Sequence, residues 1–378
     1  MTGLAVIGST GSIGVRVLNV VRRNTRRFRI VSLAAEMNVD ELVRQAAEFK
    51  PRVVCVRREE YYLSLKNSLP KGIEAVCGEE GLLYAASAAG ADTAALALSG
   101  LEGLKTAYQA IISGKNIALA NKEALVSGGE ILMREARERG VKITPIDSEH
   151  SAVLQCVSGA KNKIKRIILT ASGGPFFNCS REELARVTSS DALKHPTWRM
   201  GKKITVDSAT MMNKGLEIIE AQRLFGITPE YIIHPQSIIH SMAEFEDNSV
   251  IAQMAAPDME LPIQYALTAP KRLRTTLPQL NFAEIAKLEF FAPKEDVFPC
   301  PRIARAALKT GGLAPAALNA ANDAAVCAFL DGNLAFLQIP SAIEYALEHT
   351  DLIGALDLEN IYSIHNVAAA TANKYIYG

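Results

Sequence analysis

The pattern of apolar and polar positions predicts alternating strands and helices over the first 145 residues. Short apolar runs at 4–7, 29–34 and 52–56 predict strands. Between them, the segments 13–23 and 39–49 place apolar residues at helical spacing. Alternation of this kind predicts a parallel sheet with right-handed crossovers. Three later apolar runs are expected to add strands to the same sheet, at 93–98, 116–119 and 142–145.

The middle of the chain mixes the two patterns. Strands are predicted at 164–170 and 203–206, and a helix follows at 209–225. The segment 231–245, a polar turn and the segment 250–255 have the pattern of a β-hairpin. We therefore expect a central α+β region with a mostly antiparallel sheet, which could pack against a second subunit.

Prolines then punctuate a long connector, after which helical spacing dominates. The expected helices span 302–310, 314–330, 340–348 and 358–375. The chain as a whole is therefore predicted to be an α/β protein. Its expected regions are 1–145 for the parallel-sheet domain, 146–265 for the α+β domain, 266–300 for the connector and 301–378 for a small helical domain.

Composition and charge argue against some classes of partner. The 378 residues are 49% hydrophobic, so the chain can bury sizeable cores. A net charge of +1 gives no reason to expect nucleic acid as a partner. No apolar run reaches the roughly 18 residues that a membrane span needs, and no signal peptide is recognisable.

The six cysteines favour a reducing compartment. None of them forms a CxxC motif, so neither a zinc site nor a dithiol site is expected. Cys55 and Cys327 lie in apolar runs and are expected to be buried as small hydrophobic residues. Because nothing demands disulfides, we expect a cytoplasmic protein.

A glycine-rich turn follows the first predicted strand. Gly8, Gly11 and Gly14 occur in GSTGSIG, where the next helix is expected to begin. Glycines let the backbone turn tightly and approach a pyrophosphate, and the helix N-terminus supplies N–H donors. The spacing is a variant of the commoner GxGxxG, and a tight turn without a ligand is the structural alternative. Its place between strand and helix predicts a Rossmann-like dinucleotide-binding domain at 1–145.

The end of the second strand bears on the choice of dinucleotide. Glu36 stands where an acid would bind a ribose 2′-hydroxyl, which favours NAD. Arg57 and Arg58, at the end of the third strand, could instead supply positive charge for a 2′-phosphate. From these residues alone the choice remains open.

Polar side chains also follow a later strand of this sheet. Asn121, Lys122 and Glu123 come directly after the run at 116–119. Ligands of open α/β sheets bind at the carboxyl ends of the strands, so cofactor and substrate contacts are expected here. Solvated charges in a first helical turn are the alternative.

Two carboxylates lie close together at the next strand end. Asp147 and Glu149 flank Ser148, where a helix over 148–157 is expected to begin. If the backbone bends there, both carboxylates can converge on one ion. Oxygen ligands suit Mg²⁺ or Mn²⁺ better than Zn²⁺. The structural alternative is Ser148 as the N-cap of a helix whose dipole both acids complement.

Two loops contain further candidates. Ser172 precedes a Gly-Gly turn that could present N–H groups and a hydroxyl to an anion, although Gly-Gly-Pro is also ordinary turn chemistry. His195 and Trp198 share a loop that could close over a small ligand, with a core-anchored loop as the alternative. His234 and His240 are expected to be structural histidines.

The densest group of polar residues lies in VDSATMMNKGLE, at 206–217. Asn213, Lys214 and Glu217 are three or four residues apart and should share one helix face. Together with Ser208 they offer a hydroxyl, an amide and an ammonium to a phosphate, and a carboxylate to a metal or a hydroxyl. A capped surface helix with a Lys–Glu pair is the alternative.

These motifs occur together in one known family. The chain resembles the 1-deoxy-D-xylulose 5-phosphate reductoisomerases over nearly its whole length, in the order GSTGSIG, LANKEALV, PIDSEHSA, ASGGPF, HPTWRMG, VDSATMMNKGLE and IHPQSIIHSM. The resemblance implies an NADPH-dependent, metal-assisted enzyme of the non-mevalonate isoprenoid pathway. Such an enzyme rearranges its phosphorylated sugar substrate by retro-aldol cleavage and re-aldolisation, and then reduces the aldehyde to 2-C-methyl-D-erythritol 4-phosphate. The resemblance also implies a homodimer.

The family's site residues carry over to matching positions. The resemblance implies cofactor contacts at Thr10, Gly11, Ser12, Ile13, Asn38, Asn121, Glu123 and Gly201. It implies Mn²⁺ or Mg²⁺ ligands at Asp147, Glu149 and Glu217. It implies substrate contacts at Lys122, Ser148, Glu149, Ser172, His195, Ser208, Asn213, Lys214 and Glu217. It implies a lid at Trp198 and Met200, and catalytic roles for Lys122, Asp147, Glu149, His195 and Glu217.

One departure from the family concerns the cofactor. Glu36 and Met37 stand where the family usually has a small residue followed by Lys, Arg or Ser. NADPH is still expected, with a weaker preference over NAD. Two alternatives are a semialdehyde-type dehydrogenase and a non-catalytic dinucleotide-binding regulator. The first needs a nucleophilic Cys beside a His, and neither Cys156 nor Cys179 has such a setting in the sequence. The second should have lost a carboxylate or Lys122, and none of these residues is lost.

Overall fold

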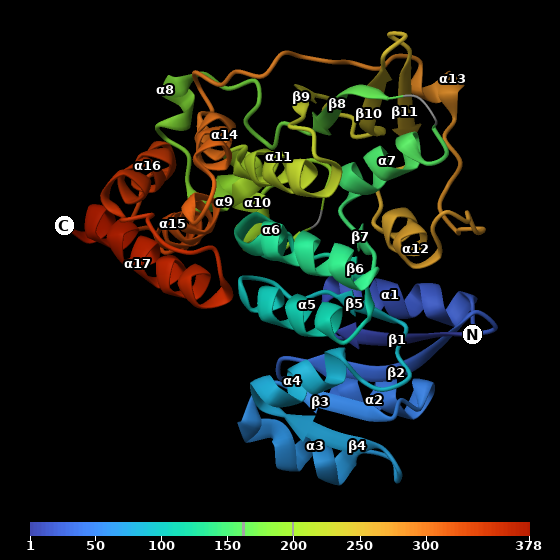
Figure 1. The fold of residues 1–378 in the computed structure, drawn as a ribbon. Helices are drawn as coiled ribbons and strands as arrows, with labels where there is room; N and C mark the ends of the chain where they lie inside the picture. Colours follow the sequence, from blue (N-terminus) through green and yellow to red (C-terminus); the bar gives the residue numbers. More distant parts are fainter. Residues whose placement is uncertain (161–162, 199) are drawn as a thin grey trace. The chain divides into compact units, whose positions relative to one another are not determined.

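The computed structural model describes residues 1–160, 163–198 and 200–378, which form two compact units (Figure 1). Unit 1 comprises Met1–Ala124, Glu130–Ser151 and Asp258–Leu277. Unit 2 comprises Leu125–Gly129, Ala152–Pro257 and Pro278–Gly378. The return of the chain to unit 1 after residue 257 was not predicted from the sequence. The domain boundaries proposed above remain predictions.

Unit 1 is built on a seven-stranded parallel sheet. Its order is β4-β3-β2-β1-β5-β6-β7. The strands are β1 (Thr2–Ile7), β2 (Phe28–Ala35), β3 (Val53–Val56), β4 (Glu74–Cys77), β5 (Thr93–Leu96), β6 (Asn116–Leu119) and β7 (Ile143–Pro145). The parallel sheet is confirmed; only β4, a short edge strand, had not been expected. Because the strand order reverses between β1 and β5, their carboxyl ends form the switch point where such sheets bind ligands.

The helices of unit 1 follow the predicted alternation. They are α1 (Ser12–Arg23), α2 (Val39–Phe49), η1 (Glu59–Tyr61), α3 (Tyr62–Ser68), α4 (Gly78–Ala86), α5 (Glu102–Ile112) and α12 (Glu260–Thr268). The helices α6 (Lys122–Arg139) and α7 (Ser148–Val157) contain residues of both units. The buried face of α1 packs on β1 and β5 and contacts α12. Ion pairs from Arg16 to Asp258 (2.9 Å) and from Arg23 to Glu260 (2.8 Å) hold the returning segment on α1.

Unit 2 contains a four-stranded sheet in the order β11-β10-β8-β9. The strands are β8 (Ile164–Ala171), β9 (Glu230–Ile233), β10 (Ile239–Phe245) and β11 (Val250–Met254). Two of the three pairings are antiparallel, as expected, and the β10–β11 hairpin is confirmed. The prediction of one continuous strand over 231–245 was wrong. Pro235 lacks a ladder N–H and Ser237 has a φ of 51°, so the chain turns between β9 and β10.

The helices of unit 2 correct a second prediction. They are α8 (Arg181–Leu184), α9 (Ser189–Ala192), α10 (Lys202–Ala209), α11 (Met212–Phe225), α13 (Phe282–Ile285), α14 (Cys300–Thr310), α15 (Ala314–Leu330), η2 (Phe336–Gln338), α16 (Ile339–His349) and α17 (Leu358–Tyr377). The strand expected at 203–206 is part of α10. Alternation of Ile204 and Val206 with polar residues suggested a strand, but Lys203 and Asp207 form an i,i+4 ion pair of 2.9 Å. The four helices expected after residue 300 are confirmed as α14, α15, α16 and α17.

The core of unit 2 joins its sheet to these helices. Met211 has a φ of 63° and separates α10 from α11, which changes the direction of the chain between them. A Cβ at Gly215 would lie 2.8 Å from the Cβ of Ala304, so this glycine allows α11 and α14 to pack closely.

Among the described residues, no helix has the length and apolar character needed to cross a membrane.

Candidate active site

The predicted site residues are distributed over both units. Unit 1 holds the group at Thr10, Gly11, Ser12, Ile13, Asn38, Asn121, Lys122, Glu123, Asp147, Ser148 and Glu149. Unit 2 holds the group at Ser172, His195, Trp198, Met200, Gly201, Ser208, Asn213, Lys214 and Glu217.

The glycine-rich turn lies at the switch point of the unit 1 sheet. The N–H groups of Gly8 and Ser9 both donate to the carbonyl oxygen of Ala34, at 2.8 Å each, which ties the turn to β2. A Cβ at Gly14 would lie 2.1 Å from the carbonyl oxygen of Gly8, so only glycine permits this approach of α1 to the turn. Gly11 caps α1 without a side chain. The first N–H groups of α1 therefore suit an anion such as a pyrophosphate.

Asn121 organises the loop that follows β5. Its Oδ1 accepts from the N–H of Ala124 at 2.9 Å and so caps α6. Its Nδ2 lies within hydrogen-bond distance of the carbonyl oxygens of Leu98 (3.2 Å) and Gly100 (2.8 Å) and of Glu123 Oε2 (3.1 Å). The buried Asn121 side chain is therefore engaged within the protein, and it positions the backbone at the switch point.

Lys122, Asp147 and Glu149 lie near one another in unit 1. Lys122 Nζ is 3.5 Å from Asp147 Oδ2. Asp147 Oδ1 accepts from the N–H groups of Glu149 (3.0 Å) and His150 (3.3 Å), so Asp147 caps α7. The alternative that made Ser148 the N-cap was wrong, because Ser148 is already the first helical residue and its hydroxyl donates to Glu149. The bend at this helix start leaves an ammonium and two carboxylates in one neighbourhood.

In unit 2, two serines flank one histidine. His195 Nε2 lies 3.1 Å from Ser172 Oγ and 3.1 Å from Ser208 Oγ. Gly174 brings the elements together: its φ is +67°, and a Cβ there would lie 2.7 Å from the carbonyl oxygen of Ser208. The loop after β8 and the end of α10 can therefore approach closely enough to share His195.

The surroundings of His195 determine its protonation. Its Nδ1 accepts from the N–H groups of Thr197 (3.1 Å) and Trp198 (2.9 Å), so this nitrogen carries no proton. Burial lowers the pKa of His195 below its usual range. The ring is therefore neutral at physiological pH, and Nε2–H is a donor directed at the two serine hydroxyls. Trp198 in the same loop packs near the ring of His240, with centroids 6.4 Å apart.

The first turns of α11 hold the densest polar group, as predicted. Asn213 Nδ2 donates to Glu217 Oε1 at 2.5 Å, and the ammonium of Lys214 pairs with Glu217 Oε2. Lys214 is 3% and Glu217 1% exposed, so the surface-helix alternative is wrong for this pair. A buried carboxylate held by an ammonium and an amide is costly to maintain for structure alone, which favours a functional role.

A buried support under α10 was missed from the sequence. Asp207 accepts from Asn322 Nδ2 at 2.8 Å and pairs with Lys203 Nζ at 2.9 Å, while Lys203 also contacts Asp323 at 3.0 Å. These contacts join α10, which carries Ser208, to α15. The spacing of Lys203 and Asp207 would have indicated the pair, had the segment been recognised as a helix.

Comparison with known proteins identifies the family. Three models match: "1-deoxy-D-xylulose 5-phosphate reductoisomerase" at 4–129, its "C-terminal domain" at 143–225, and "DXP reductoisomerase C-terminal domain" at 254–371. The chain is 47% identical to the reductoisomerase of Lachnospira eligens over 372 residues, covering 97% of this chain and 98% of that protein. The chain belongs to the 1-deoxy-D-xylulose 5-phosphate reductoisomerase family. It is thus similar to NADPH-dependent oxidoreductases.

Solved structures of the reductoisomerase family agree with this fold. The Zymomonas mobilis enzyme in complex with NADPH matches with a TM-score of 0.94 and 41% identity, covering 100% of this chain and 99% of that one. A complex of the family with NADPH, fosmidomycin and magnesium matches with a TM-score of 0.92 and 37% identity, covering 100% and 98%.

Family membership and the cysteines both argue against a semialdehyde-type dehydrogenase. Cys156 is buried, and its Sγ lies 3.9 Å from the carbonyl oxygen of Ser241. Burial raises the pKa of the Cys179 thiol, which disfavours a thiolate nucleophile. All six cysteines are free thiols. The expectation that Cys327 is buried was wrong, because it lies on an exposed position of α15.

His234 has a structural role, as expected. His234 is fully buried, its Nδ1 lies 2.8 Å from the carbonyl oxygen of Glu289, and its Nε2 accepts from two backbone N–H groups at 3.2 Å. These bonds hold the turn between β9 and β10 against the segment at 289.

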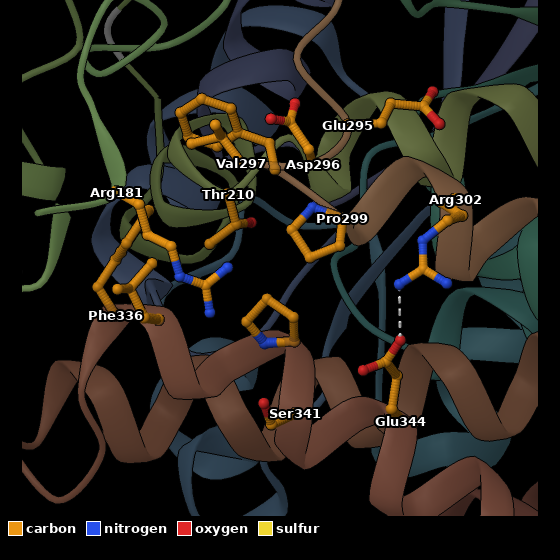
Figure 2. Close-up of a pocket in the computed structure, with 13 residues that line it drawn as sticks. Arg181, Thr210, Glu295, Asp296, Val297, Pro299, Arg302, Phe336, Ser341 and Glu344 are labelled. Carbon is orange, nitrogen blue, oxygen red and sulfur yellow. Dashed lines mark hydrogen bonds and ion pairs between the residues drawn. The ribbon is translucent and has the colours of Figure 1, made fainter.

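A separate cavity of about 270 Å³ in unit 2 is lined mainly by the segment 295–299, which precedes α14, and by η2 and α16 (Figure 2). The guanidinium of Arg302 pairs with Glu344 at 3.0 Å, and Glu295 and Asp296 add further negative charge. Of the described residues that line the cavity, none belongs to the predicted reductoisomerase site. Its mixed charges give it no evident preference for a phosphate.

Proposed function

We propose that this chain converts 1-deoxy-D-xylulose 5-phosphate to 2-C-methyl-D-erythritol 4-phosphate, with the site residues expected from the sequence. The observation that carries the proposal is the donor group of unit 2. The neutral His195 directs Nε2–H between two serine hydroxyls, while Asn213 and Lys214 present further donors on α11. Such a set suits the phosphate of a sugar phosphate.

The phosphate group anchors the substrate. Ser172, Ser208, Asn213 and Lys214 would bind its oxygens, with His195 as an additional neutral donor. Binding energy from this unreactive end orients the reacting carbons and so contributes to catalysis. The ammonium of Lys214 adds charge in a buried setting, where it is weakly screened.

A divalent metal is the second requirement. Solved relatives contain magnesium together with fosmidomycin. Asp147, Glu149 and Glu217 would hold the ion, and their oxygen-only donor set fits Mg²⁺ or Mn²⁺. The metal supplies Lewis-acid stabilisation of negative charge on the oxygens of the substrate. Lys122, 3.5 Å from Asp147, would assist proton transfer at a substrate oxygen.

NADPH is the reductant of the second step. Its pyrophosphate would bind at the turn formed by Thr10, Gly11, Ser12 and Ile13, because Gly14 permits α1 to begin close to that turn. Asn38, which caps α2, and Asn121 and Glu123, at the start of α6, would complete the nucleotide site in unit 1. Gly201, with Trp198 and Met200 in the preceding loop, would cover the bound ligands.

We further propose a cytoplasmic homodimer. The edge strand β11 leaves Val250 (48%) and Ile251 (47%) exposed, and an unpaired apolar edge favours association with a second copy. The six free thiols are compatible with a reducing compartment.

A single assay tests the function. Purified protein receives 1-deoxy-D-xylulose 5-phosphate, Mn²⁺ and NADPH, and the nicotinamide absorbance is followed. Substrate-dependent and metal-dependent oxidation of NADPH, abolished by a chelator and restored by Mn²⁺, supports the proposal. NADPH oxidation with an acyl phosphate or semialdehyde instead, or binding of NADPH without turnover, would favour one of the two alternatives.

A further inference from the structure

The cofactor site of unit 1 contains a charge cluster that the proposed function does not explain. Glu36, at the end of β2, stands where a Rossmann-like domain contacts the ribose 2′ position. An acid there normally hydrogen-bonds the 2′-hydroxyl of NAD and repels the 2′-phosphate of NADPH. The chain must therefore obtain positive charge for that phosphate from another element.

The end of β3 is held directly beside Glu36. The N–H of Arg57 donates to the carbonyl oxygen of Ala35 at 2.9 Å, and the N–H of Arg58 donates to that of Glu36 at 3.0 Å. The backbone thus continues the pairing of β2 and β3 past the last strand residue. Both arginines are consequently fixed next to the position that selects the dinucleotide.

The two arginines differ in how firmly they are held. Arg57 Nη1 contacts both carboxylate oxygens of Glu36, at 3.0 and 3.1 Å, and its other amino group pairs with Glu102 at the start of α5. Among the described residues, the charged partners of Arg58 are at longer distances, 3.4 Å to Glu36 and 3.8 Å to Glu60. Its side chain is 52% exposed, against 31% for Arg57. Arg58 can therefore turn toward a new anion at little cost, whereas Arg57 is engaged on both sides.

We propose that Arg58 binds the 2′-phosphate of NADPH, while Arg57 is a positioning residue that draws the carboxylate of Glu36 away from the ribose. Glu36 then weakens the preference for NADPH without reversing it, because its charge is partly balanced by Arg57. The inference rests on NADPH as the reductant, but on neither the substrate nor the metal site.

Binding of adenosine fragments tests this without turnover. Calorimetry compares 2′,5′-ADP, which carries the 2′-phosphate, with 5′-AMP, which lacks it. Arg58→Gln should weaken 2′,5′-ADP about tenfold, the size expected for one charged hydrogen bond, and leave 5′-AMP unchanged. Glu36→Gln should strengthen 2′,5′-ADP several-fold and leave 5′-AMP unchanged. Arg57→Gln should weaken 2′,5′-ADP in the wild-type background but have little effect when combined with Glu36→Gln, as a positioning role requires.

Arg52→Gln is the matched control. Arg52 lies at the opposite end of β3 from Arg58, and its replacement removes the same positive charge. It should leave both affinities unchanged. An unaltered ratio of the two affinities in Arg58→Gln would overturn the proposal, as would an equal loss of both ligands. Weaker binding of 5′-AMP in Glu36→Gln would also overturn it, because Glu36 would then bind the ribose hydroxyl directly. Since no substrate or metal is present, these results are independent of the test of function above.

Discussion

At the scale of single residues, the chemistry depends on how burial fixes the state of a side chain. Glu217 is almost fully buried, yet it remains paired with Lys214 and hydrogen-bonded to Asn213. His195 is neutral because burial lowers its pKa and because two backbone N–H groups donate to Nδ1. Each of these states predicts a distinct response to substitution.

Glu217→Gln should abolish turnover and weaken binding of Mn²⁺, but leave NADPH affinity within about twofold, because the proposed role is that of a metal ligand. Steady-state kinetics, Mn²⁺ titration and NADPH titration measure the three quantities. The exposed Glu348→Gln on α16 serves as the control and should change none of them. A large loss of NADPH affinity in Glu217→Gln would exclude the assignment.

His195→Asn should weaken binding of a phosphonate substrate analogue about tenfold, because Asn retains an acceptor for the two N–H groups but loses the Nε2–H donor.

The pH dependence of analogue binding follows from the lowered pKa of His195. The neutral form persists from alkaline pH to below about 6.5, and protonation at lower pH places a proton on Nδ1 facing two donors.

Analogue affinity of the wild type should therefore fall more steeply below that pH than affinity of the variant, in which this residue does not titrate. The phosphonate titrates in the same way in both measurements, so the difference between the two profiles reports on His195 alone. Identical profiles would mean that His195 does not control binding.

At the scale of elements, helix α10 is placed by its contact with α15. Asp207→Ala removes the acceptor of the buried Asn322 and should lower the free energy of unfolding by about 1–3 kcal/mol. Since α10 carries Ser208, the analogue should also bind more weakly. Urea unfolding followed by circular dichroism measures the stability. Asp331→Ala, an exposed position at the end of α15, should change it by less than about 0.5 kcal/mol; equal losses would refute the role of Asp207.

The loop between α9 and α10 can be followed through Trp198, the only tryptophan. Its indole packs near the ring of His240, and its backbone N–H donates to Nδ1 of His195. A ligand that engages His195 should therefore change the emission of Trp198. A phosphonate analogue at saturation provides the test, and an unchanged spectrum would show that the loop keeps its surroundings when ligand binds.

At the scale of the whole molecule, the proposed dimer gives the clearest prediction. Ile251→Lys places a charge on the exposed edge strand β11 and should convert a dimer into a monomer in analytical ultracentrifugation. Ile353→Lys changes an even more exposed residue, at 90%, outside that strand and should remain dimeric. A wild-type monomer, or a dimer that survives Ile251→Lys, would contradict this interface.

Some features followed from the sequence alone. Periodicity located the parallel sheet, the hairpin and the C-terminal helices, because those signals depend on neighbouring residues only. The motifs similarly sufficed to recognise the family, and the i,i+4 spacing of Asn213 and Glu217 predicted their contact correctly.

Other features were decided by tertiary structure. The segment 203–206 is helical because α10 packs on α15 through Asp207 and Asn322, a contact between residues far apart in sequence. The return of the chain to unit 1 depends on Arg16 and Asp258, which are equally distant. The protonation of His195 and the charge cluster at Glu36, Arg57 and Arg58 likewise follow from neighbours supplied by folding. The sequence thus determined which chemical groups are present, while the fold determined their protonation and partners, because burial and long-range contacts set those properties.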